Sequence, residues 1–81
     1  MQIQVLFFGK LRDVYQTNEA SLELPPKSSV EDLFQLCAAR HPEFASYRSS
    51  VVASRNREFV SWNALLESGD EVAFLPPVSG G

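Results

Sequence analysis

The last two residues, Gly80 and Gly81, are the part of this sequence best suited to chemistry. They end the chain in a carboxylate that has no side chain beside it. Because glycine lacks a Cβ, such an end can enter a narrow active site of another protein. The alternative is an ordinary frayed terminus, since chain ends are commonly disordered. The pair is therefore a candidate reactive terminus, provided that the preceding residues present it.

The residues before this pair favour a projecting tail. Two prolines follow the strand-like run that ends at Leu75, and proline favours extended backbone because its ring fixes φ. We expect residues 1–75 to form one domain and residues 76–81 an extended tail. In that tail Gly81 would react, and five residues would line the threading path: Pro76, Pro77, Val78, Ser79 and Gly80.

Composition limits what the domain can do. The 81 residues suffice for one modest core and no separate catalytic domain. An apolar content of 44% excludes disorder. The net charge of −3, with scattered cations, argues against a nucleic-acid partner and favours a basic protein surface. No apolar stretch reaches membrane-spanning length, so no membrane role is expected and the predicted location is the cytoplasm.

The single cysteine, Cys37, cannot form an internal disulfide, which agrees with a reducing compartment. His41 follows four residues later, so the two could share a helix face as an activated thiol or half a metal site. The favoured interpretation is that Cys37 belongs to the core, because it continues an apolar stripe. No metal site is expected.

The pattern along the chain predicts an α+β domain with the order ββαβββ, in which one main helix packs on one face of a mixed sheet. Alternation and turn residues place the strands, and helical periodicity places the helices. The predicted strands are 2–8, 20–24, 51–54, 58–60 and 71–75; the main helix runs from 30 to about 40, with short helical segments at 11–15 and 44–48.

The main helix has a clear start and a clear buried face. Either Ser28 or Ser29 can act as the N-cap, with an acidic residue three positions later, and Pro42 stops the helix. Its apolar stripe consists of Val30, Leu33, Phe34 and Cys37.

With one main helix, only one face of the sheet is covered by the chain itself. Alternation along the first and last strands sends Leu6, Phe8, Ala73 and Leu75 to the other face. If the two strands are neighbours, these residues form an exposed apolar patch at the root of the tail, which would bind a partner protein. The alternative is that flanking segments fold over the patch.

Three segments resemble the small subunit of molybdopterin synthase, over the whole chain. They are the opening Ile3-Gln4-Val5-Leu6-Phe7-Phe8-Gly9 with Leu11-Arg12-Asp13, the capped helix at Ser29-Val30-Glu31-Asp32-Leu33, and the long C-terminal run from Leu66 through Gly69-Asp70-Glu71-Val72-Ala73-Phe74-Leu75-Pro76-Pro77-Val78-Ser79-Gly80-Gly81. The last run is the most specific.

The resemblance implies a ubiquitin-like β-grasp fold with adjacent first and last strands. It also implies a sulfur carrier of molybdenum cofactor biosynthesis that is not catalytic alone. A ubiquitin-activating-type adenylyltransferase would use ATP to convert the Gly81 carboxylate to an acyl adenylate, and sulfur would then give a thiocarboxylate. The large synthase subunit, in a heterotetramer, would transfer that sulfur to the cyclic pyranopterin precursor. No cofactor would be bound by the carrier.

Other residues have less defined roles. Arg12, and with less support Lys10, could dock an acidic partner surface, and Trp62 is expected to pack. Arg55 departs from the family pattern that the resemblance implies, which usually has an aliphatic residue before the turn asparagine, so a more polar hairpin end is expected. Three alternatives stay open: a carrier for thiamine or tRNA thiolation, a ubiquitin-like protein modifier, and an interaction module with an inert tail.

Overall fold

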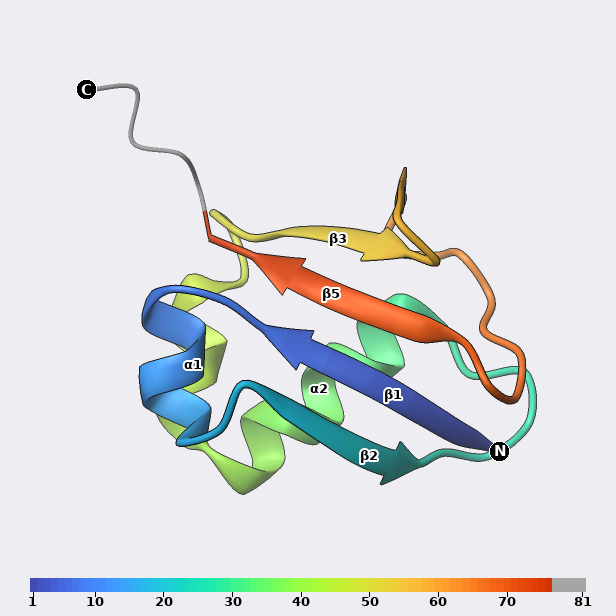
Figure 1. The fold of residues 1–81 in the computed structure, drawn as a ribbon, viewed down its shortest axis with the longest axis horizontal. Coiled ribbons are helices and arrows are strands. Elements are labelled where there is room, and N and C mark those ends of the chain that lie inside the picture. The colour runs from blue at the N-terminus through green and yellow to red at the C-terminus, as the bar shows by residue number, and fades with distance from the viewer. Residues whose placement is uncertain (77–81) are drawn as a thin grey trace.

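The computed structural model describes residues 1–76, which form a sheet with helices on one side (Figure 1). The strands are β1 (Gln2–Phe7), β2 (Glu19–Glu23), β3 (Val52–Arg55), β4 (Glu58–Val60) and β5 (Glu71–Leu75). The helices are α1 (Lys10–Tyr15), α2 (Val30–Arg40) and the 3-10 helix η1 (Pro42–Tyr47). The expected ββαβββ order and the two short helical segments are therefore confirmed, with bounds that differ by one to two residues.

The first and last strands lie side by side at the centre of the sheet. The strand order is β2-β1-β5-β3-β4, with β1 and β5 parallel and the other neighbours antiparallel. This is the mixed sheet that the sequence predicts. Because β1 and β5 run in the same direction, the end of β5, where the tail begins, lies next to the end of β1.

Helix α2 begins at a capping box. The Ser29 hydroxyl accepts a hydrogen bond from the Asp32 backbone N–H, and the Asp32 carboxylate accepts one from the Ser29 N–H. These bonds satisfy two groups that a helix start leaves without partners. The helix ends at Arg40, before Pro42, as predicted. Its predicted stripe is fully buried: Val30, Leu33, Phe34 and Cys37.

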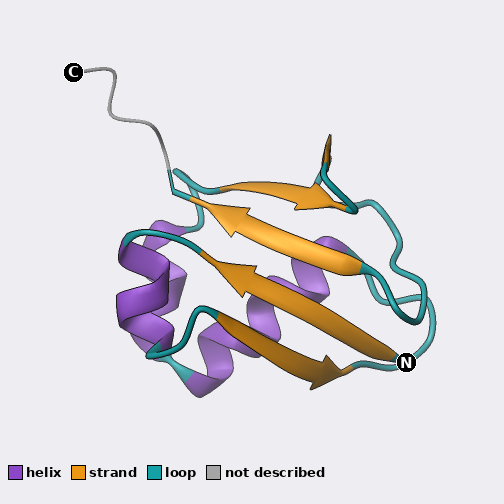
Figure 2. Ribbon diagram, viewed as in Figure 1, coloured by secondary structure: helices purple, strands orange, loops and turns teal. Residues whose placement is uncertain are grey.

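The core lies between α2 and one face of the sheet (Figure 2). Ile3, Val5 and Phe7 of β1 are 0–1% exposed and point into it. Aromatic rings fill its centre: Phe34 contacts Phe44 and Phe74 with ring centroids 4.9 Å and 5.4 Å away. Such contacts stabilise a small domain beyond their buried area. The helices thus leave one sheet face, toward the viewer in Figure 1, without cover from the domain itself.

Trp62 packs as expected. Its ring stacks on Phe74, with centroids 6.0 Å apart, and the Arg48 guanidinium carbon lies 3.6 Å from the Trp62 ring centroid. Arg48 also forms an ion pair with Glu31 of α2, and the pKa of Glu31 is lowered by that hydrogen bond. Within residues 1–76, no helix is long and apolar enough to cross a membrane.

Candidate docking face and tail root

The face of the sheet opposite α2, called here the outer face, combines side chains from all five strands. The register pairs Leu6 of β1 with Ala73 of β5, so both belong to this face. It also pairs Val52 of β3 with Leu75, and Phe59 of β4 with Ser54. Outward-facing residues on β1, β5, β3 and β4 are therefore neighbours across the sheet, near the C-terminal end of β5.

Apolar residues gather on this half of the outer face. We call them the apolar surface: Leu6, Phe8, Val52, Phe59, Ala73 and Leu75. Phe59 is 76% exposed, Val52 48% and Phe8 44%, while Leu6 and Leu75 are half-buried. Exposed apolar residues that adjoin one another in this way are typical of protein-binding surfaces. In the described part of the chain no segment folds over them, contrary to the alternative that the sequence left open.

One member differs from expectation. Ala73 was expected to be exposed, but only 8% of it is accessible. Its short side chain lies beside that of Ser54, which is also 8% exposed, and the register places this pair of small residues between the larger Leu6 and Phe59. Ala73 therefore lies at the base of the apolar surface, where little of its side chain is accessible to a partner.

The sequence interpretation missed two members, Val52 and Phe59. Their place on the outer face depends on how β3 and β4 align with β5, which residues far apart in sequence decide. The signal available in the sequence was the pair of turn residues Asn56 and Arg57. In the structure their φ values are 51° and 72°, which fit a tight hairpin. Counting alternation outward from that turn places Phe59 opposite Ser54.

Asn56 fixes this hairpin against the start of β5. Its side chain donates to Asp70 Oδ1 at 3.0 Å and accepts a hydrogen bond from the Glu71 N–H at 3.0 Å. Arg55, which was expected to depart from the family pattern, donates to the Leu65 carbonyl at 2.6 Å. That contact holds the Arg55 side chain against the domain's own loop. Arg12 is exposed on α1 and lies on no strand of the outer face.

Pro76, the first residue of the predicted tail, rests against Gly9. Gly9 has φ +55°, and a Cβ built there would lie 3.1 Å from Pro76 Cγ. The turn after β1 thus needs glycine for its conformation and for the close approach of the tail root. The other predicted tail residues, Pro77, Val78, Ser79, Gly80 and Gly81, lie outside the described residues.

Replacing Gly9 with alanine is expected to destabilise the domain by about 1–3 kcal/mol, because a Cβ is strained at this φ and crowds Pro76. Chemical denaturation monitored by Trp62 fluorescence measures this cost. Gly69→Ala is a comparison variant, since its φ of +90° is also strained but its Cβ would meet nothing within 4 Å. A Gly9→Ala variant as stable as the wild type would contradict this account.

Cys37 is part of the core and not a reactive thiol. It is 0% exposed, and burial raises its pKa to about 12, an effect that the Arg40 charge only partly offsets. The thiol is therefore protonated at neutral pH. Residues 1–76 contain no group of three or more side chains arranged to hold a metal ion. The interpretation of Cys37 and His41 as half a metal site thus gains no support.

Cys37 is expected to make stability depend on alkaline pH. The folded thiol keeps its proton up to about pH 12, whereas an unfolded thiol loses it near 9.0, so the free energy of unfolding falls between these values. Cys37→Ala should cost about 1 kcal/mol at neutral pH and flatten this fall. Denaturation curves from pH 7 to 11 test it, and an unchanged slope would contradict the buried-thiol account. Tyr15, whose pKa is also raised by burial, contributes to the fall in the same direction.

Comparison with known proteins gives one consistent group. The model of the ThiS family matches residues 5–81. The molybdopterin synthase sulfur carrier subunit of Chlamydomonas reinhardtii is 42% identical over 83 residues and covers 100% of both chains. A solved Pyrococcus furiosus structure, assigned as molybdopterin converting factor subunit 1, is 30% identical, with a TM-score of 0.88 over 96% of this chain and 99% of that one.

A complex of subunits 1 and 2 of the molybdopterin-converting factor from Helicobacter pylori has the same fold. There the identity is 21% and the TM-score 0.71, over 100% of both chains. The likeness to that structure concerns fold alone. Together with the Pyrococcus furiosus structure, it confirms the predicted β-grasp architecture.

Proposed function

The chain belongs to the ThiS family, and from this premise we propose that it is the sulfur carrier subunit of a molybdopterin synthase. Full-length similarity to curated sulfur carrier subunits supports this assignment. The structural observation that carries it is the apolar surface, which lies on the outer face beside the root of the tail. A carrier needs both parts: a face that docks and a terminus that reacts.

The reactive group is the Gly81 carboxylate. A carboxylate resists nucleophiles because its charge is delocalised, so it must first be activated. An activating enzyme of the ubiquitin-activating type joins it to the α-phosphate of ATP, and pyrophosphate leaves. The terminal sulfur of a persulfide then attacks the acyl carbon and AMP leaves. A thiol reduces the resulting S–S bond, which frees the thiocarboxylate.

The thiocarboxylate needs no general base from this chain. It is anionic at neutral pH and nucleophilic, so it is ready to attack an electrophilic carbon. The carrier is not an enzyme by itself, and the active site belongs to the large subunit. There the terminus donates sulfur to the cyclic pyranopterin precursor, and two loaded carriers supply the two sulfurs of each dithiolene.

The large subunit docks on the apolar surface in this proposal. Phe59, Val52 and Phe8 supply most of the exposed apolar area, and Leu6 and Leu75 continue it to the tail root. Burying such side chains drives association by the hydrophobic effect. Residues Pro76 to Gly80 then lead the terminus away from the docked face into the partner's active site.

Mass spectrometry of the intact protein tests the proposal. The chain is incubated with a ubiquitin-activating-type enzyme of molybdenum cofactor synthesis, ATP and a persulfide donor. The expected product gains the mass difference between sulfur and oxygen at Gly81, and the control without ATP gains nothing. Failure to gain this mass, with an enzyme that loads an established carrier in parallel, would overturn the proposal.

A second reaction separates this function from other sulfur carriers. The loaded chain is mixed with the large synthase subunit and the cyclic pyranopterin precursor, and dithiolene formation is followed. A carrier for thiamine or tRNA thiolation would load with sulfur and yet transfer none of it in this assay.

A further inference from the structure

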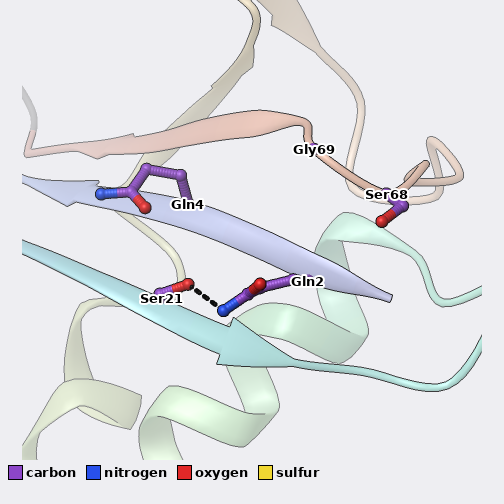
Figure 3. A pocket seen from close by; sticks show the side chains of 5 residues that line it. All are labelled: Gln2, Gln4, Ser21, Ser68 and Gly69. Atoms are coloured by element: carbon purple, nitrogen blue, oxygen red, sulfur yellow. Dashed lines mark hydrogen bonds between the residues drawn. The ribbon is translucent and has the colours of Figure 1, made fainter.

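The outer face holds a second feature, a polar pocket beside the apolar surface. Five residues line it: Gln2, Gln4, Ser21, Ser68 and Gly69 (Figure 3). Its volume is about 290 Å³. Since a water molecule occupies about 30 Å³ of liquid, the space suits several waters or one long side chain. Gln4 lies two residues before Leu6 on β1, so pocket and apolar surface adjoin.

The pocket offers hydrogen-bond acceptors that have no partner in the described part of the chain. Gln2 Nε2 donates to Ser21 Oγ at 2.8 Å, and Gln4 Nε2 donates to Glu19 Oε2 at 3.1 Å. Both glutamines therefore direct an N–H toward β2. Within residues 1–76 no hydrogen bond reaches either Oε1 atom or the Ser68 hydroxyl, so these acceptors are left for water or a partner.

The charge around the pocket is negative. Glu71 is paired with Gln4 across β5, and Glu19 is hydrogen-bonded to the same Gln4 from β2. Glu23, paired with Gln2, already lies 3.3 Å from the N-terminal amine. The outward positions of β1, β2 and β5 include no lysine or arginine. Glu19 and Glu71 thus give the pocket a negative potential that favours a cation.

A partner on the apolar surface must also cover this pocket. Five strands about 4.8 Å apart and about 18 Å long make a face of about 24 by 18 Å. A standard protein interface buries about 800 Å² on each partner, which exceeds the roughly 430 Å² outline of that whole face. The free acceptors would then lose water. Each would be buried without a hydrogen bond, which disfavours binding, if the partner supplied no donor.

We propose that the polar pocket receives a cationic side chain, arginine or lysine, from the protein that docks on the apolar surface. This inference rests on the proposed function, in which that protein is the large synthase subunit. An arginine or lysine head group carries only donors, so it matches the acceptors of Gln2, Gln4 and Ser68. Its charge is balanced by Glu19 and Glu71. The apolar surface supplies affinity, and the pocket sets the orientation of the partner.

Opposite charges at Ser68 test this inference. Ser68 is exposed in the turn before β5, and its side chain forms no hydrogen bond in the described part of the chain, so substitution leaves the fold intact. The Kd for the large subunit is measured at low salt. Ser68→Lys should weaken binding about fivefold, and Ser68→Glu should strengthen it about twofold or more. Both effects should shrink in 1 M salt, where charges are screened beyond about 3 Å.

Ala39→Lys and Ala39→Glu are the matched controls, because Ala39 is exposed on α2, behind the sheet. They should change Kd less than twofold. Suppose that the wild type binds the large subunit and transfers sulfur, but that the two Ser68 variants have the same Kd as each other or the Kd of the wild type. The pocket inference is then wrong and the proposed function stands. If the wild type neither binds the large subunit nor transfers sulfur, the proposed function fails, and the inferred occupant fails with it.

Discussion

Removal of Gly81 is expected to abolish sulfur transfer and to leave the stability of the domain unchanged. The shortened chain ends at Gly80, so its carboxylate stops one residue short of the position that the full chain reaches in the activating enzyme. Because a displacement of about 1 Å can already cost a hundredfold in rate, a loss of more than a thousandfold is expected. Thiocarboxylate formation, followed by mass spectrometry, measures this loss.

Stability is expected to hold because the core does not depend on the terminus. In the described residues, the last member of the hydrophobic core is Phe74. The free energy of unfolding should therefore change by less than about 0.5 kcal/mol. Ala39→Ser is the control, since it keeps the chain length, lies exposed on α2 behind the sheet and should still load. Cofactor maturation by the chain that lacks Gly81 would contradict a terminal reaction centre.

The sequence predicts the local features of this fold because their causes are local. The capping box needs only Ser29 and Asp32, three residues apart, and the buried stripe of α2 follows from helical periodicity. Alternation likewise places Ile3, Val5 and Phe7 in the core. Periodicity cannot predict which strands are neighbours. The family resemblance predicts that β1 and β5 are adjacent, and the structure confirms this pairing.

The apolar surface was only partly predictable, because it depends on alignment between distant segments. Leu6 and Leu75 follow from alternation within single strands. Phe59 and Val52 join them only through the β3–β4 and β3–β5 registers. The prediction that Ala73 is exposed was wrong for a related reason. Side chains on the adjacent strands determine how much of a small side chain is accessible to solvent.

The outer face has two parts, the apolar surface and the polar pocket. Together they suit a carrier that binds two partners one after the other. In the proposed function, one enzyme loads the single terminus and another unloads it, so one carrier would not bind both proteins on the same face at once. An apolar surface at the tail root binds any partner that admits the tail. Polar and charged groups beside it, such as those around Gln4, then allow partners to be distinguished by electrostatic complementarity. Tight, permanent binding to either enzyme would stop turnover.

Replacing Phe59 with alanine is expected to weaken binding to the large subunit about 30-fold or more, the cost typical of an aromatic anchor at an interface. Phe59 is 76% exposed and so contributes little to the core, which predicts a change in unfolding free energy within about 0.5 kcal/mol. Titration calorimetry gives the Kd, and thermal denaturation checks the fold.

Leu65→Ala is the matched control for Phe59→Ala. Leu65 is 57% exposed but forms a β-bridge with Ser29, the N-cap of α2, and so lies away from the outer face. It should leave the Kd within about twofold, as residues outside the interface do. If Leu65→Ala weakened binding as much as Phe59→Ala, the loss at Phe59 would not be specific to the outer face. That result would contradict the apolar surface as the docking site, because the prediction requires binding to depend on exposed apolar side chains of this face and not on those elsewhere.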